Sequence, residues 1–160
     1  MPKLLNPEER LILLSFLDER FGMSTDSFSD FEIAAFSRQA FLLRRQKKDY
    51  CFTEAHFVRC GLPFLRDVAG YLKPTTAFVQ RFGHLARKNV LDLDFKSLFT
   101  LAKKGVIQRA TSMGEASQGY VILKNGDLYF GIALLIQDEK IVSRFPKALK
   151  QALARLKDCS

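Results

Sequence analysis

The sequence predicts an α+β protein with a small N-terminal α+β domain and a basic, sheet-rich C-terminal domain. A capped amphipathic helix is expected near the N-terminus, and Asn125-Gly126 between two apolar runs is a strong hairpin signal. Residues 1–72 contain ten Lys and Arg against ten Asp and Glu, whereas residues 73–160 contain fifteen against seven. The second segment therefore carries the whole net charge of +8, and we expect two domains, 1–72 and 73–160.

Composition bounds the class of protein. The 160 residues are 48% hydrophobic and include 15 Phe, which is ample for a packed core. The apolar runs are too short to span a membrane, and "MPKLLNPEER" lacks the apolar stretch of a signal peptide. Cys51, Cys60 and Cys159 are odd in number and have no CxxC spacing, so we expect reduced thiols in a cytoplasmic protein.

The first expected element is a helix over residues 7–21. Asn6 can cap it, Pro7 suits its first turn, and Gly22 can end it. Its apolar positions recur at spacings of three and four: Leu11, Leu14, Leu17 and Phe21. The segment that follows, "FEIAAFSRQAFLLRRQKKDYCF", is compatible both with a helix and with a hairpin around "SRQ", and "CGLPFLRD" is punctuated by Gly and Pro.

The second half is expected to begin with a helix capped by Thr75 or Thr76 and closed by Gly83. After it, the sequence predicts a strand in "KNVLDLD", an amphipathic helix in "FKSLFTLAKKG" and a short strand in "VIQRA". "GYVILKNGDLYFGIALLI" is expected to form the hairpin, with a bulge or a close backbone approach at Gly131. "EKIVSRF" then predicts a last strand before a terminal helix over residues 147–157.

Three cations surround the expected start of that terminal helix. Pro146 suits the first turn of a helix, and Arg144, Lys147 and Lys150 lie around it. The positive end of the helix dipole disfavours further cations, so this arrangement is locally costly unless an anion binds there. A solvated, charged helix start is the alternative interpretation.

Three stretches together resemble the PUA domain, a small RNA-binding pseudobarrel named for pseudouridine synthase and archaeosine transglycosylase. They are "PTTAFVQRFGHLARKNVLDLD", "GYVILKNGDLYFGIALLI" and "KIVSRFPKALK", which look like the PUA-type tails of Nop/Sun RNA cytosine-C5 methyltransferases. The neutral first half, with "ERFG", resembles the domain that precedes PUA in small two-domain ribosome-biogenesis factors. Ala148 stands where many such tails have glycine, which bears on how closely a phosphate could approach there.

This resemblance implies a mixed, barrel-like C-terminal domain with flanking helices that binds rRNA or tRNA. The RNA surface of the family combines the helix after the "PTT" element with the last strand and its turn. The expected phosphate contacts are Arg87, Lys88, Lys103, Lys104, Lys140, Arg144 and Lys147, extended by Lys150 and Lys157. Tyr120, Tyr129 and Phe145 are candidates for base stacking, although single aromatic residues more often lie in the core.

Motifs for catalysis and for cofactors are not recognisable in the sequence. It has no GxGxxG, Pro-Cys pair, P-loop or HExxH, so we expect no intrinsic catalysis and no cofactor. Cys51, His56 and Cys60 form C-x4-H-x3-C without an evident fourth ligand, which favours buried thiols over a zinc site. His84 lies where it can cap a helix end or reach an RNA base.

The function expected from these observations is non-catalytic RNA binding in rRNA maturation, ribosome biogenesis or RNA modification. The N-terminal domain would then meet a protein partner or shape the same RNA-binding groove. A second hypothesis is an accessory or specificity subunit of an RNA methyltransferase that acts mainly through protein contacts. A third is a peripheral membrane binder using Leu149, Leu153 and Leu156, a stripe that is more simply explained as facing the core.

Overall fold

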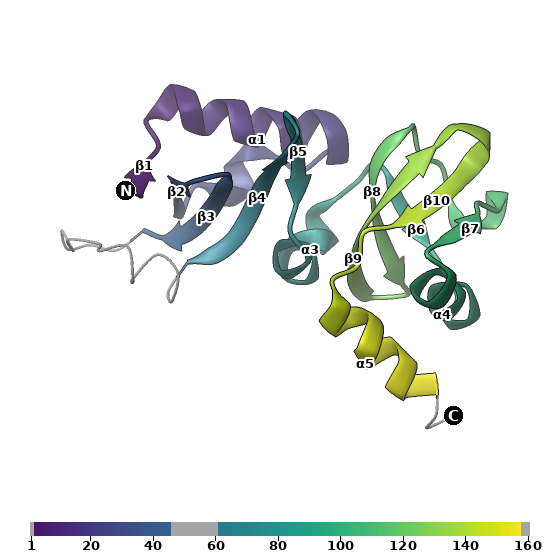
Figure 1. The fold of residues 1–160 in the computed structure, drawn as a ribbon. Helices are drawn as coiled ribbons and strands as arrows, with labels where there is room; N and C mark the ends of the chain where they lie inside the picture. Colours follow the sequence, from purple (N-terminus) through teal and green to yellow (C-terminus); the bar gives the residue numbers. More distant parts are fainter. Residues whose placement is uncertain (1, 46–60, 158–160) are drawn as a thin grey trace. The chain divides into compact units, whose positions relative to one another are not determined.

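The computed structural model describes residues 2–45 and 61–157, and it confirms the α+β class (Figure 1). The described residues contain four α-helices and two five-stranded sheets. The chain divides into two compact units, residues 1–78 and 79–160, which are described separately below as unit 1 and unit 2. Each unit contains one of the two sheets.

Unit 1 is built on an antiparallel meander in the order β1-β2-β3-β4-β5, accompanied by α1 (Pro7–Phe21). The strands are β1 (Lys3–Leu4), β2 (Phe31–Phe36), β3 (Gln39–Arg44), β4 (Leu62–Val68) and β5 (Tyr71–Pro74). The helix α3 (Thr76–Phe82) follows β5 and extends across the division between the units.

The predicted helix over residues 7–21 is confirmed at both ends. Asn6 Oδ1 accepts a hydrogen bond from the backbone N–H of Glu9 at 2.8 Å, and Asn6 N donates to Glu9 Oε2 at 3.0 Å. This reciprocal capping box satisfies two backbone donors of the first turn. Gly22 ends the helix in the left-handed region, with φ of 64°.

The ambiguous segment after α1 forms a hairpin over its described part. β2 and β3 pair from Phe31↔Arg44 to Phe36↔Gln39, so the helical alternative is wrong for these residues. Pairing between the two strands and burial of their central residues outweigh the helix propensity of the Ala and Leu residues here. The remainder of the segment, residues 46–52, lies outside the described residues.

A bulge in β4 shapes the core of unit 1. Gln39 pairs with Arg66 and Phe41 with Pro63, which leaves two residues of β4, Phe64 and Leu65, opposite one residue of β3. Both of these residues are buried, and Gln39 Nε2 donates to the Leu65 carbonyl at 3.0 Å. The irregularity therefore turns two consecutive side chains inward while keeping the carbonyl of Leu65 hydrogen-bonded.

The division between the units differs from the boundary expected at residues 72 and 73, which falls inside β5. Lys73 pairs with Arg66 in the first sheet, and Thr75 donates its hydroxyl to the Pro63 carbonyl at 2.6 Å. Thr75 Oγ1 also accepts from Phe78 N at 3.1 Å, as predicted for a cap of this helix. Phe78 is fully buried in unit 1.

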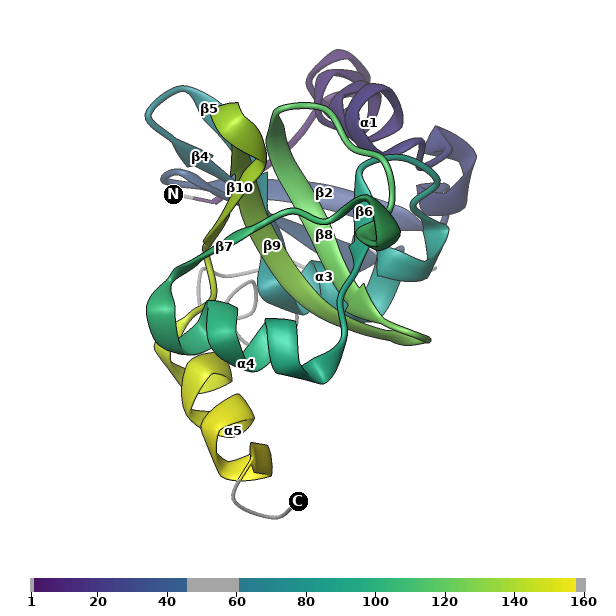
Figure 2. The same ribbon diagram turned by 90° about the vertical axis from the view of Figure 1, so that its right-hand side faces the viewer.

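Unit 2 contains a mixed sheet in the order β6-β8-β9-β10-β7 with two helices (Figure 2). β6 pairs with β8 in parallel, and the other pairs are antiparallel. The strands are β6 (Val90–Asp92), β7 (Val106–Gln108), β8 (Gly119–Asn125), β9 (Leu128–Ile136) and β10 (Lys140–Ser143), and the helices are α4 (Phe95–Lys104) and α5 (Lys147–Lys157). Over the described residues neither five-stranded sheet closes on itself, and the PUA-like pseudobarrel implied by the resemblance stays a prediction.

The central hairpin of unit 2 forms at its sequence signal, with the two-residue turn shifted by one position to residues 126–127, because Asn125 pairs with Leu128. β8 and β9 are joined through Gly126, whose φ of 55° is in the left-handed region that this tight turn requires. Leu123 pairs with Gly131 and Lys124 with Tyr129, so Phe130 is the extra residue of a bulge. The bulge expected at Gly131 is therefore confirmed within one residue.

Both helices of unit 2 pack against the sheet through a narrow apolar side. Leu98 and Leu101 of α4 and Leu153 of α5 belong to one core cluster with residues of β6, β8, β9 and β10. Asp94 caps α4 by accepting from Ser97 N at 2.7 Å, and this bond holds the pKa of the carboxyl below its usual value. The charged cap therefore stabilises the fold at neutral pH, and its contribution is lost as the pH falls through the lowered pKa.

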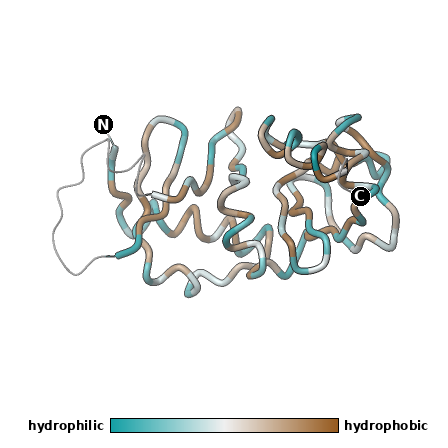
Figure 3. Tube along the Cα trace, turned by 90° about the horizontal axis from the view of Figure 1, so that it is seen from below, coloured by the Kyte–Doolittle hydropathy of each residue, from teal (hydrophilic) through white to brown (hydrophobic). Residues whose placement is uncertain are grey.

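Hydrophobic and hydrophilic segments alternate along the chain in both units (Figure 3). Among the described residues, no helix is long and apolar enough to cross a membrane.

Candidate functional site

The end of α4 meets the end of β10, and this contact gathers cations from two parts of the sequence. Ser143 N donates to the Gly105 carbonyl at 2.8 Å, and Gly105 directly follows α4. Lys103 and Lys104 therefore lie at the same end of unit 2 as Arg144 and the start of α5. The exposed cations Lys103, Lys104, Arg144, Lys147 and Lys150 are called the α4–α5 cluster below.

The helix ends give the two halves of this cluster different electrostatic settings. Lys103 and Lys104 lie in the last turn of α4, where the helix dipole favours cations. Lys147 and Lys150 lie in the first turn of α5, where the dipole disfavours them. Over residues 2–45 and 61–157, no ion pair joins any cation of the cluster to a carboxylate. An anion at the start of α5 would relieve this repulsion.

The chain between β10 and α5 holds the start of α5 in place. Ser143 Oγ accepts from Phe145 N at 3.2 Å, and the Pro146 carbonyl accepts from Leu149 N at 3.0 Å and from Lys150 N at 3.2 Å. Phe145 is only 6% exposed and belongs to the core cluster. Its ring therefore offers no face to a base, and the stacking role expected for Phe145 is wrong.

A second concentration of cations lines an open pocket of about 690 Å³ on unit 2, called the Arg109 pocket. Its cations are Arg87 and Lys88, from the segment before β6, and Arg109, directly after β7. The other residues of its wall are Asn89, Glu115, Ala116 and Ser117. Residues far apart in the sequence thus converge on one hollow that is lined mainly by polar and charged side chains.

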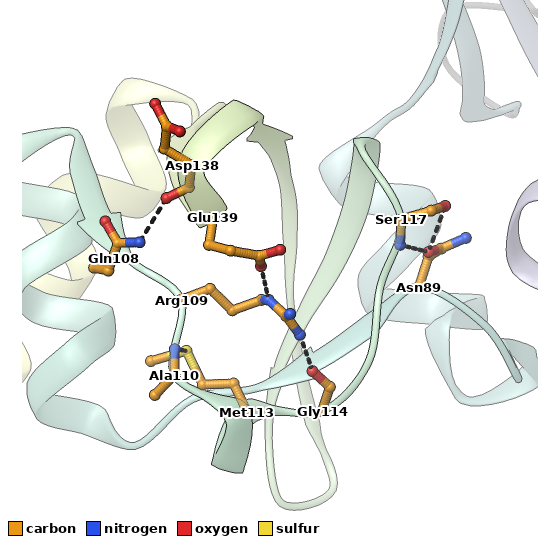
Figure 4. Close-up of polar contacts among 9 residues, drawn as sticks. All are labelled: Asn89, Gln108, Arg109, Ala110, Met113, Gly114, Ser117, Asp138 and Glu139. Carbon is orange, nitrogen blue, oxygen red and sulfur yellow. Dashed lines mark hydrogen bonds and ion pairs between the residues drawn. The ribbon is translucent and has the colours of Figure 1, made fainter.

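Arg109 is held on two sides in this pocket (Figure 4). Its Nε forms an ion pair with Glu139, and its Nη1 donates to the Gly114 carbonyl at 2.6 Å. Its backbone N–H donates to the Glu139 carbonyl at 2.7 Å, and the neighbouring Gln108 Nε2 donates to the Asp138 carbonyl at 2.6 Å. The Arg109 side chain is 16% exposed, and these contacts fix the orientation of its guanidinium.

Asn89 fixes another part of the pocket wall. Its φ is 55°, a left-handed conformation that asparagine tolerates better than most residues. Asn89 Oδ1 accepts from Ser117 N at 2.8 Å and from Ser117 Oγ at 3.2 Å, and the Asn89 carbonyl accepts from Ile122 N at 2.9 Å. These bonds tie the segment that carries Arg87 and Lys88 to the chain entering β8 (Figure 4).

The residues predicted to form one strip thus fall into two groups. Arg87 and Lys88 line the Arg109 pocket, whereas the α4–α5 cluster contains most of the others. Lys140 pairs with Gln108 at the start of β10, beside Arg109, and is exposed. Lys157 is the last residue of α5.

The aromatic candidates other than Phe145 are half-buried. Tyr120 lies on β8, opposite Leu134. The Tyr129 ring packs so closely on Gly83 that a Cβ there would lie 2.5 Å from Tyr129 Cδ1, and Lys124 Nζ lies 6.0 Å from the ring centroid. His84 is exposed in the short helical turn Gly83–Leu85. Their roles in binding stay predictions.

Arg109 is the residue that the sequence reasoning missed. The signal available was an arginine at the end of a short strand followed by the small and polar stretch "ATSMGEAS", which is typical of a binding loop. Its partner Glu139 is distant in the sequence, and nothing in the sequence distinguishes its other partner, Gly114. The pairing of β7 with β10 is what brings Glu139 beside Arg109 and forms the pocket.

Two alternative interpretations of the sequence concern a metal site and a membrane-binding stripe. Cys51, His56 and Cys60 lie outside the described residues, and the part of the chain that the structure does describe contains no group of His, Cys, Asp and Glu able to hold a metal ion. Leu153 is 1% exposed and Leu149 packs against the same core cluster, so these two residues of the stripe considered for membrane binding face the core, whereas Leu156 is 53% exposed.

No protein-family model matches the chain, and no curated protein matches it.

Proposed function

We propose that this chain is a non-catalytic RNA-binding protein that grips structured RNA with the basic surface of unit 2. Its resemblance to the PUA domain supports a role in rRNA maturation, ribosome biogenesis or RNA modification. Unit 2 carries fourteen Lys and Arg against seven Asp and Glu, an excess suited to a polyanion.

The observation that carries this proposal is the α4–α5 cluster. Three of its members, Arg144, Lys147 and Lys150, surround the positive end of a helix, which is unfavourable in the absence of an anion. Lys103 and Lys104 are brought to the same place by the bond between Ser143 and Gly105. Lysine and arginine in such a group neutralise successive phosphates and release their counterions.

Salt dependence tests the proposal directly. Affinity of the full chain for a structured RNA hairpin should fall steeply with salt, with a slope of log K against log salt between about −2 and −4 if the cluster neutralises several phosphates. Fluorescence anisotropy over a series of salt concentrations measures this slope. A slope near zero, or no binding at low salt, would reject RNA binding by unit 2.

A second candidate function is that of an accessory subunit acting through protein contacts. The observation in its favour is on unit 1, where Leu11 and Ile12 of α1 are 57% and 67% exposed. Adjacent exposed apolar side chains of this size are suited to a protein partner.

Affinity purification from cell extract, with and without nuclease, separates the two functions. For the accessory function, we expect a partner that is retained after nuclease treatment and is lost from a Leu11→Ser/Ile12→Ser variant. Partners that all disappear with nuclease, and that the variant retains equally, would contradict the accessory function and leave RNA binding as the explanation.

A further inference from the structure

We propose that the Arg109 pocket receives the phosphate and ribose of one unpaired nucleotide of the RNA that unit 2 binds. This inference rests on the proposed function, because the nucleotide belongs to the same RNA chain that the α4–α5 cluster binds. It implies that the pocket makes the protein prefer single-stranded RNA to double-stranded RNA, a preference that the α4–α5 cluster alone does not provide.

The lining of the pocket indicates a polar, anionic ligand. Its volume of about 690 Å³ is in the range of sites for small organic groups, and Ala116 is the only apolar residue among the described residues that line it. Arg87, Lys88 and Arg109 supply three positive charges and Glu115 one carboxylate, but Glu139 already pairs with Arg109, so Arg87 and Lys88 are the cations left for an anionic ligand. An uncharged aliphatic or aromatic ligand would leave the charged side chains of the pocket without hydrogen-bond partners. A phosphorylated ligand therefore fits best.

The low exposure of Arg109 favours an unpaired nucleotide over a duplex. Its side chain is 16% exposed, and its guanidinium is already oriented by Glu139 and the Gly114 carbonyl. Phosphates on the rigid, convex backbone of an A-form duplex reach exposed cations more readily than a side chain as covered as that of Arg109. A nucleotide splayed out of a loop or bulge can reach such a side chain, and such unstacked nucleotides are what sequence-specific RNA-binding proteins usually recognise.

Arg87 and Lys88 complete the anion-binding side of the pocket. Both are exposed, and no described carboxylate forms an ion pair with either. The bonds between Asn89 and Ser117 hold their segment against the rest of the unit. Glu115 repels a phosphate from its own part of the wall and can accept a hydrogen bond from a ribose hydroxyl or a base amino group.

The strand β10 connects the pocket to the α4–α5 cluster. Lys140 at one end of β10 lies beside Arg109 and Glu139, and Ser143 at the other end bonds to Gly105 beside the cluster. Three residue steps of a β-strand span about 10 Å. Nucleotides close together in one RNA chain can therefore reach both places.

The test compares two double variants that remove the same charge from exposed positions. Arg87→Ser/Lys88→Ser alters the pocket, and Lys103→Ser/Lys104→Ser alters the cluster as the matched control. Binding of a short unstructured RNA strand and of a blunt duplex of the same sequence is measured for each variant and for the original chain. Circular dichroism confirms that all three are folded.

Arg87→Ser/Lys88→Ser should weaken single-strand binding by about tenfold, the loss expected from removing charged hydrogen bonds, and should change duplex binding much less. The control should weaken both RNAs to a similar extent. Equal loss for the two RNAs in the pocket variant would overturn this inference. If the original chain binds neither RNA, the proposed function itself fails, so the two failures are distinguishable.

A second variant tests Arg109 without removing it. Glu139→Gln takes away the carboxylate that pairs with the guanidinium, so single-strand binding should strengthen by a few-fold, roughly the effect of one released charge contact. Asp138→Asn is its control, because it makes the same charge change one residue away on a side chain that does not contact Arg109 in Figure 4. Equal gains in the two variants would contradict a role for the Arg109 pocket.

Discussion

Charge reversal at two positions of the α4–α5 cluster, Arg144→Glu together with Lys147→Glu, is expected to weaken the binding of structured RNA by well over tenfold. Two attractive contacts with phosphates become repulsive, and the loss of counterion release lowers the salt slope at the same time. Folding should be unaffected, because Arg144 is exposed and glutamate in the first turn of a helix is favourable. Anisotropy titrations at a single low salt concentration measure the effect.

The matched control for this prediction is Arg81→Glu with Lys96→Glu. Both residues are exposed, Arg81 on α3 and Lys96 at the opposite end of α4 from the cluster, and the net charge changes by the same amount. The control should weaken binding only through the general loss of positive charge. If the two variants lose the same affinity, or if reversal at Arg144 and Lys147 changes nothing, the cluster is not the RNA-binding surface.

The largest expected loss of stability comes from Phe78→Ala. Phe78 is fully buried, with its ring centroid 4.9 Å from that of Phe64 and 5.9 Å from that of Phe28. Removing the ring leaves a cavity in a core that cannot collapse onto it, which costs about 3–5 kcal/mol in the free energy of unfolding. Alanine favours helix, so the loss arises from packing and not from the backbone of α3.

Urea denaturation of the full chain, followed by far-UV circular dichroism, tests this value. Arg81→Ala on the same helix is the control, since an exposed substitution there should change the free energy of unfolding by less than about 0.5 kcal/mol. A loss below about 1 kcal/mol for Phe78→Ala would mean that these three rings do not form the core of unit 1.

Elements with local signals could be predicted from the sequence. The helix α1 has its cap, its first-turn proline and its terminal glycine within residues 6–22, and the hairpin β8–β9 is specified by Asn125-Gly126. Both depend on interactions between residues close together in the chain. The bulged strand β4 lacked such a signal, because the inward orientation of both Phe64 and Leu65 is produced by pairing with β3.

Prediction of the candidate site from the sequence meets the same limit, because local signals do not reveal contacts between distant residues. Phe145 is a stacking candidate in the sequence because it lies near the basic residues, yet Ile141, Ser143 and Phe145 alternate along one extended segment and all three are buried. Period-two reasoning continued past the strand would have predicted an inward ring. No comparable pattern leads to Arg109, whose importance arises only when the hairpin turn that carries Glu139 is brought beside it.

The order β6-β8-β9-β10-β7 has a consequence for how the protein is made. Both edge strands of the second sheet come from the earlier part of unit 2, and their hydrogen-bonding partners β8 and β10 are synthesised later. We therefore expect the nascent chain to keep β6 and β7 unpaired until the ribosome has released the hairpin β8–β9 and the strand after it. Because these strand pairs join residues that are far apart in the sequence, we expect unit 2 to fold more slowly than a helical bundle of the same size.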